Sequence, residues 1–231
     1  MDTSQIRVLS FDLDDTLWDG NQVILKAEQA MLDWMLQHTP NVFERFTKES
    51  LRQHKFQFIK NNPHLMNRIS EARQRYLAEL FSELNHSNPL EKSKACFDAF
   101  YQARQQVVLF EGVTDTLETL KQHFQLIAIT NGNADIHLTG LGGFFDVALN
   151  AEDFSQPKPH GDIFKAGLGH THARAEQCLH IGDHPEHDML GAYNVGMKTC
   201  WLKDGSREWN QDFKAHIEIR HVSELLPLLI K

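Results

Sequence analysis

Short apolar runs alternate with helix-like segments at the two ends of the chain. Residues 6–11 form a brief, mostly apolar stretch, which is typical of a buried strand in a parallel sheet. Helical spacing of apolar residues follows at 114–123 and 162–168. Further strand-like runs lie at 125–130, 145–149, 178–183, 199–202 and 217–219. This alternation predicts an α/β fold, a doubly wound parallel sheet covered by helices on both faces.

A block of about ninety residues has helical periodicity throughout and interrupts this alternation. Apolar residues recur there at three- and four-residue spacing, with no strand pattern between them. The four stretches are 23–35, 51–59, 69–84 and 95–107. Four helices without a strand favour a small bundle. We therefore expect a Rossmann-like core formed by residues 1–17 and 109–231, with an inserted helical cap domain at 18–108.

Composition narrows the class of protein. The chain has 231 residues, enough to bury a full core, and a formal net charge of −8, which argues against nucleic acid as the main partner. It contains no apolar run near the ~20 residues that span a membrane, and residues 1–5 lack the pattern of a signal peptide. We expect a cytoplasmic protein that does not enter a membrane. The cysteines are widely spaced, so we predict that they are buried thiols: Cys96, Cys178 and Cys200.

The first predicted strand ends on acidic residues, Asp12, Asp14 and Asp15. Ligands of open α/β sheets bind beyond the carboxyl ends of the strands, so these carboxylates would lie where such folds do chemistry. Carboxylates so close together repel one another unless a cation lies among them, and Mg2+ is the first choice for oxygen ligands. A simple acidic turn that caps the next helix is the alternative. The pattern Asp-x-Asp-x-Thr directly after a buried strand favours the metal.

Two further strand ends carry groups suited to an anion. Thr130 closes the second strand and precedes Asn131 and Gly132, so a hydroxyl and backbone N–H groups are available to hold phosphate oxygens. Such a sequence is also an ordinary way to turn out of a strand. Lys158 stands between two prolines, which fix the backbone on either side of it. A lysine is usually solvated, but this one is expected to be held in place.

A third acidic strand end lies at Gly182-Asp183. Asp183 projects from the strand, and Asp188 would lie about one turn into the following helix, facing back. Such a pair can bind a metal and orient a neighbouring lysine, although either residue could instead be a helix cap. Together the four strand ends supply an acidic nucleophile, a phosphate-binding hydroxyl, a fixed lysine and a metal carboxylate. These are the parts that phosphoryl transfer needs.

At these positions the chain resembles the haloacid dehalogenase-like hydrolases, in the branch with a helical cap inserted after the first strand. The four motifs correspond to Asp12 through Thr16, Thr130 through Gly132, Lys158, and Gly182 through Asp188. Segments 129–134 and 196–201 are most similar to bacterial phosphatases of flavin metabolism. Those enzymes act on FMN and on 5-amino-6-(5-phospho-D-ribitylamino)uracil.

The resemblance implies a mechanism. Asp12 would attack phosphorus and form an aspartyl-phosphate, while Asp14 would protonate the leaving alkoxide and then take a proton from water. Mg2+ would be held by a carboxylate oxygen of Asp12, the backbone carbonyl of Asp14 and the carboxylate of Asp183. Dehalogenase members of the family lack the acid/base carboxylate two residues after the nucleophile, so Asp14 favours a phosphate ester.

The same resemblance assigns the remaining groups. Thr130, Asn131 and Lys158 would bind the transferring phosphoryl group, and Asp188 would hold either Lys158 or a metal-bound water. The expected activity is a Mg2+-dependent phosphomonoester hydrolase that acts on a small phosphorylated metabolite. Two alternatives stay open: a phosphomutase of the same fold, and a non-catalytic module that accepts phosphate on an aspartate and keeps it.

Overall fold

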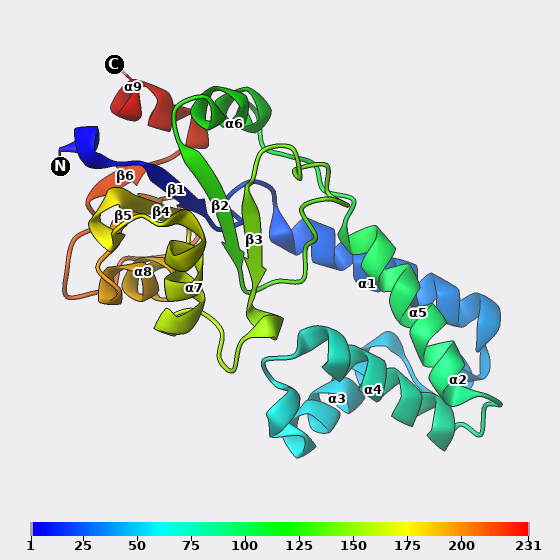
Figure 1. The fold of residues 1–231 in the computed structure, drawn as a ribbon. Helices are drawn as coiled ribbons and strands as arrows, with labels where there is room; N and C mark the ends of the chain where they lie inside the picture. The colour runs from blue at the N-terminus through cyan, green and yellow to red at the C-terminus, as the bar shows by residue number, and fades with distance from the viewer. Residues whose placement is uncertain (1, 231) are drawn as a thin grey trace. The chain divides into compact units, whose positions relative to one another are not determined.

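The computed structural model describes residues 2–230 and divides into two compact units (Figure 1). The first, here called the α/β unit, runs up to Gly20 and resumes at Val107. The second, the helical unit, comprises Asn21–Gln106. The sequence analysis placed these boundaries after residues 17 and 108. Trp18 lies instead in the α/β unit, where its indole N–H donates to Asp14 Oδ1 at 2.8 Å.

Six parallel strands form the sheet of the α/β unit within residues 2–230. Their order across the sheet is β3-β2-β1-β4-β5-β6, so β1 lies in the centre between β2 and β4. The strands are β1 (Val8–Phe11), β2 (Gln125–Thr130), β3 (Val147–Asn150), β4 (Cys178–Gly182), β5 (Lys198–Leu202) and β6 (Ile217–Ile219). The central strands are mostly apolar and, apart from half-buried Gln125, fully buried, as expected of a parallel sheet with both faces covered.

Two groups of helices accompany the sheet (Figure 1). One consists of α7 (Gly161–Thr171) and α8 (Gly191–Asn194), which contact each other and strands β2, β3 and β5. The other consists of α6 (Val113–Lys121) and α9 (Leu225–Leu229). The doubly wound α/β fold predicted from the sequence is confirmed. Among the described residues no helix combines the length and hydropathy needed to cross a membrane.

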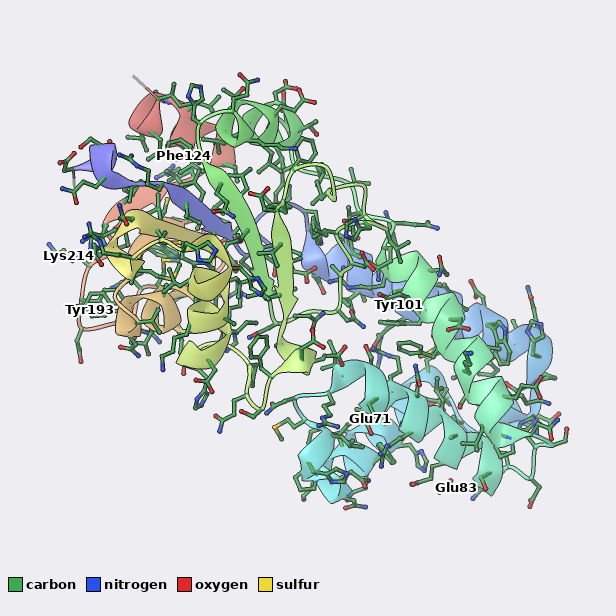
Figure 2. The ribbon with its side chains drawn as sticks, in the orientation of Figure 1. Glu71, Glu83, Tyr101, Phe124, Tyr193 and Lys214 are labelled. Atoms are coloured by element: carbon green, nitrogen blue, oxygen red, sulfur yellow. The ribbon has the colours of Figure 1, made fainter. Side chains whose placement is uncertain are left out.

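The helical unit contains one more α-helix than its periodicity predicts. Its elements are α1 (Gly20–His38), α2 (Asn41–Arg45), α3 (Lys48–Asn61), α4 (Ile69–Glu83) and α5 (Pro89–Arg104). The additional helix is α2, which is too short to produce a periodic pattern. Glu71 and Glu83 lie near the two ends of α4 (Figure 2). Glu71 forms an ion pair with Arg75, and a Glu83 carboxylate oxygen lies 3.4 Å from His54 Nε2.

This unit has an apolar core of its own. Side chains from α1, α3, α4 and α5 pack together there and are almost fully inaccessible. The largest of them are Phe81, Phe100 and Tyr76, with Leu77 and Leu80 between them. Arg73 lies over the Phe100 ring, 3.6 Å from its centre. Such a core makes the helical unit a separate packing unit rather than a long loop.

Candidate active site

The central strands bring two acidic loops to one edge of the sheet. Phe11, the last residue of β1, pairs with Ile181 of β4, and the next N–H, that of Asp12, donates to the Ile181 carbonyl at 2.9 Å. Asp12 and Asp183 therefore leave neighbouring strands at the same level. Both are buried. The carboxyl ends of parallel strands are where such sheets bind ligands.

Lys158 reaches this edge from the loop before α7. Its ammonium group donates to Asp12 Oδ1 at 2.5 Å, to Asp188 Oδ1 at 2.6 Å and to the Ile129 carbonyl at 2.8 Å. Asn131 fixes the backbone of Lys158, because its side-chain amide donates to the Lys158 carbonyl at 3.1 Å and accepts from the Lys158 N–H at 2.8 Å. Burial alone would lower the pKa of Lys158, but the two carboxylates outweigh it and raise that pKa.

Asp188 is turned toward the sheet by an irregular helix. Residues Pro185–Leu190 form a π-helical turn, which places the Asp188 side chain against Gly182. A Cβ atom at Gly182 would lie 2.5 Å from Asp188 Cγ, so only glycine leaves room for it. The second carboxylate oxygen of Asp188 accepts from the His184 N–H at 3.0 Å. Both oxygens of Asp188 are thus engaged within the protein.

Asp12, Asp183 and Asp188 form a buried acidic cluster in which one oxygen of each lies within 4.8 Å of the others. When ionised, the three carboxylates and the Lys158 ammonium carry a net charge of −2. Burial and, to a smaller extent, the charge of Asp188 raise the pKa of Asp183 to about 7, and burial also raises the pKa of Asp12. Carboxylate oxygen ligands and a net charge of −2 fit a hard divalent cation such as Mg2+.

Asp14 and Thr130 lie at the same edge, and each has a hydrogen bond within its own loop. Asp14 accepts from the Trp18 indole, as described above, and a Cβ atom at Gly20 would come within 2.8 Å of Asp14 Cβ. Thr130 is buried at the end of β2, and its hydroxyl accepts from the Gly132 N–H at 2.9 Å. The structure thus brings Asp12, Lys158, Asp183 and Asp188 into one cluster. Asp14 follows the same strand as Asp12, and Thr130 closes the neighbouring strand β2.

Two residues of the site have no counterpart in the sequence analysis. His180 lies in β4 and is fully buried, with Nε2 3.4 Å from Asp188 Oδ1 and Nδ1 2.9 Å from the Ser10 hydroxyl. Arg207, from the loop after β5, donates to Asp183 Oδ2. A polar residue inside an apolar strand was a usable signal for His180. The loop of Arg207 gives no signal in the sequence.

Comparison with known proteins identifies the family of this chain. The haloacid dehalogenase-like hydrolase family matches residues 6–196. A 5-amino-6-(5-phospho-D-ribitylamino)uracil phosphatase, YigB of Escherichia coli (strain K12), is 29% identical over 231 residues and covers 97% of each chain. The pyrophosphatase PpaX of Bacillus cereus (strain G9842) is 26% identical over 235 residues, with the same coverage.

A solved structure agrees with this assignment. The 2-haloacid dehalogenase from Pseudomonas syringae pv. Tomato DC3000 superposes with a TM-score of 0.90 at 34% identity, covering 97% of this chain and 98% of its own. The family match spans most of the chain and includes the four predicted motifs. The protein therefore belongs to the haloacid dehalogenase-like hydrolases.

Proposed function

We propose that this protein is a Mg2+-dependent phosphomonoester hydrolase that acts on small phosphorylated metabolites through an aspartyl-phosphate. One observation carries the proposal: a buried lysine ammonium bridges Asp12 and Asp188 inside an acidic cluster that also contains Asp183. A nucleophile, a fixed cation and a carboxylate site for a metal therefore meet at the loop-bearing edge of the sheet. The phosphatase names of two relatives that span the whole chain support the same reaction class.

Asp12 is the proposed nucleophile. It attacks phosphorus in line, a bond forms between its carboxylate oxygen and phosphorus, and the ester oxygen leaves with the bonding electrons. Water then cleaves the aspartyl-phosphate and regenerates the carboxylate. Lys158 holds Asp12 Oδ1 and offsets the negative charge that gathers around the phosphoryl group. Asp188, which contacts Lys158 and not solvent, orients that ammonium group.

Asp14 is the proposed acid and base. It is less buried than Asp12, and its bond to the Trp18 indole fixes the direction of its carboxyl group. It gives a proton to the departing alkoxide, which would otherwise be a poor leaving group, and later accepts a proton from the attacking water. Halide needs no such proton. An acid at this position therefore supports ester hydrolysis rather than dehalogenation.

Thr130 and Asn131 are proposed to bind the remaining phosphoryl oxygens at the end of β2. Since the Asn131 side chain is engaged with the Lys158 backbone, its contribution to phosphate would come from its own backbone N–H. Asp12 and Asp183 would hold Mg2+ through carboxylate oxygens, together with the backbone carbonyl of Asp14. When bound, the cation would reduce the repulsion between the nucleophile and the phosphate dianion.

The helical unit is proposed to act as a cap that selects the substrate. Insertions of this kind contribute shape and closure in enzymes that must exclude water. The E. coli relative is named for 5-amino-6-(5-phospho-D-ribitylamino)uracil, and we propose this compound or FMN as the substrate. Because the second relative is named a pyrophosphatase, inorganic pyrophosphate belongs in the same substrate panel. The panel is ranked by kcat/KM with Mg2+ present.

The direct test uses an aryl phosphate such as p-nitrophenyl phosphate. The parent protein should release phosphate with Mg2+, and the activity should vanish with EDTA and in Asp12→Asn. Asp162→Asn, which removes a carboxylate from an exposed position on α7, is the matched control and should retain activity. Full turnover in EDTA would contradict the proposal.

A second assay separates phosphatase from dehalogenase chemistry. The Pseudomonas syringae relative is named a 2-haloacid dehalogenase, so halide release from a 2-haloacid should be measured under the same conditions. We expect no halide release by the parent protein. Halide release that exceeds phosphate release would reverse the assignment.

A further inference from the structure

Arg207 joins two carboxylates at the edge of the acidic cluster. It lies in the loop between β5 and β6, in residues 203–216. Its Nη1 donates to Asp183 Oδ2, and its Nη2 lies 3.9 Å from Asp15 Oδ2. The same carboxylate of Asp183 belongs to the cluster with Asp12 and Asp188. The guanidinium group thus lies on a carboxylate to which a divalent cation would bind.

The backbone around Arg207 is anchored independently of this contact. Trp209, two residues further on, packs 5.0 Å from the Trp201 ring, and its indole N–H donates to the Phe213 carbonyl at 2.8 Å. Phe213 stacks on Tyr193 of α8 at 4.0 Å, and Tyr193 is labelled in Figure 2. The loop therefore keeps its place when the Arg207 side chain changes partner. Only the side chain needs to move.

Asp183, in contrast, is held in position. It follows β4 directly, its side chain is 4% exposed, and its carbonyl accepts from the Trp201 indole at 2.9 Å. The Arg207 side chain is 33% exposed and so has a path to solvent. If a cation binds Asp183, the guanidinium group is the partner that can leave.

Charge makes its departure favourable. With ionised carboxylates, the cluster and Lys158 carry −2, and Arg207 reduces this excess to −1. Ionised Asp15 adds one further negative charge, so the conflict is local: a divalent cation and the guanidinium group would meet on the same carboxylate of Asp183, where two positive charges repel each other. The guanidinium group carries a permanent positive charge, so only displacement of the side chain relieves the repulsion. It must move.

We propose that Arg207 is an internal competitor of the divalent cation: it occupies Asp183 when no cation is bound and weakens cation binding by the free energy of the contact that must be broken. This inference rests on the metal site of the proposed function. It gives Arg207 a positioning role, because its guanidinium group occupies the Asp183 carboxylate while the cation is absent. It also sets the Mg2+ concentration that the protein requires.

Calorimetric titration of EDTA-treated, dialysed protein with Mg2+ tests the proposal without any substrate. Arg207→Gln should bind Mg2+ about tenfold more tightly than the parent, since a charge-assisted hydrogen bond no longer competes. Arg207→Lys keeps the charge but loses the fork that reaches two carboxylates, and should gain less, about threefold. The control is Arg174→Gln, which removes an equal charge beside the amino end of β4, at the opposite edge of the sheet. Its Kd should stay within twofold of the parent value.

Thermal unfolding with and without Mg2+ distinguishes the competitor role of Arg207 from a purely structural one. Arg207→Gln should lower Tm in EDTA, where Asp183 loses its partner, and should leave Tm in saturating Mg2+ unchanged. A structural residue would lower Tm equally in both. In the parent, the Arg207 side-chain Nε–H resonance, assigned by its absence in Arg207→Lys, should move on Mg2+ addition toward the position of exposed arginines. Because this resonance is followed in the parent protein, the test remains valid even if Arg207→Gln does not fold.

The outcomes separate this inference from the function on which it rests. Equal or weaker Mg2+ binding by Arg207→Gln, or a static Arg207 resonance in a parent protein that binds Mg2+, overturns the competitor role and leaves the phosphatase proposal intact. If the parent does not bind Mg2+ at all, both fail. Asp183→Asn identifies the site, because it should abolish binding in either background.

Discussion

At the residue scale, Lys158 determines whether the acidic cluster can exist. It is 2% exposed and touches two carboxylates, so its charge is the main local compensation for Asp12 and Asp188. The sequence analysis singled out Lys158 because prolines flank it, but it did not predict the contact with Asp12, which depends on where the loops after β1 and before α7 meet. The two hydrogen bonds between the Asn131 side chain and the Lys158 backbone were not predictable either, since they depend on where two distant loops meet.

Replacing Lys158 with methionine should cost roughly 3–5 kcal/mol of unfolding free energy at pH 7.5 in EDTA, because buried carboxylates lose their partner. Urea denaturation measures the loss. Lys165→Met, at an exposed position of α7, is the control and should change stability by less than about 0.5 kcal/mol. Equal losses in the two variants would show that Lys158 does not stabilise the cluster.

The contribution of His180 to stability depends on pH, because this histidine is buried. Burial lowers its pKa, and the nearby Asp188 opposes that shift only in part. The folded protein therefore keeps His180 neutral while the unfolded chain binds a proton below its ordinary pKa of about 6.5. Stability from this group is complete above that pH and is lost as the pH falls toward the folded-state pKa.

Substituting His180 with glutamine should flatten the dependence of stability on pH below about 6.5. The expected change approaches one proton, or about 1.4 kcal/mol per pH unit. Denaturant unfolding in EDTA at several pH values measures it, and His170→Gln, at an exposed position, should keep the slope of the parent. A steep slope in His180→Gln would mean that other groups cause the acid sensitivity.

At the scale of elements, periodicity predicted the long segments and failed for the short ones. The strand Gln125–Thr130 has the bounds that the sequence indicates, because a continuous apolar run carries its own signal. The helices α2 and α9 have five residues each and were missed. Helices so short are held by packing rather than by propensity. The π-helical turn at Pro185–Leu190 was missed for a related reason, since tertiary contacts of Asp188 define it.

That turn gives an element-scale prediction. Gly182→Ala would place Cβ 2.5 Å from Asp188 Cγ, and Asp188 cannot retreat because Lys158 and the His184 N–H hold both of its oxygens. We expect a stability loss of about 1–3 kcal/mol and a large fall in phosphatase kcat.

Gly169→Ala is the matched control. It lies in α7, a Cβ there would meet nothing within 4 Å, and alanine favours the helix, so stability should rise by about 0.5–1 kcal/mol. Thermal unfolding and kcat, measured on both variants, show whether Asp188 requires glycine at position 182. Gly182→Ala with the stability and kcat of the parent would show that the close approach is not required.

At the scale of the whole molecule, every residue of the acidic cluster lies in the α/β unit, and the helical unit has its own core. A core substitution in the helical unit should therefore leave Mg2+ binding unchanged. Leu80→Ala, at a fully buried position of α4, should cost about 2–5 kcal/mol of stability. Its Mg2+ Kd, measured by calorimetry well below Tm, should match the parent. A several-fold weaker Kd would show that the site depends on the helical unit.

The central claim is that Asp12 bonds to phosphorus, and acid quenching during turnover tests it most directly. The parent protein, mixed with Mg2+ and a phosphorylated substrate and quenched in acid within milliseconds, should yield a phosphate-bearing peptide that contains Asp12. Asp12→Asn should yield none. Rapid turnover with no phosphate on any peptide, or phosphate on a residue other than Asp12, would contradict the account.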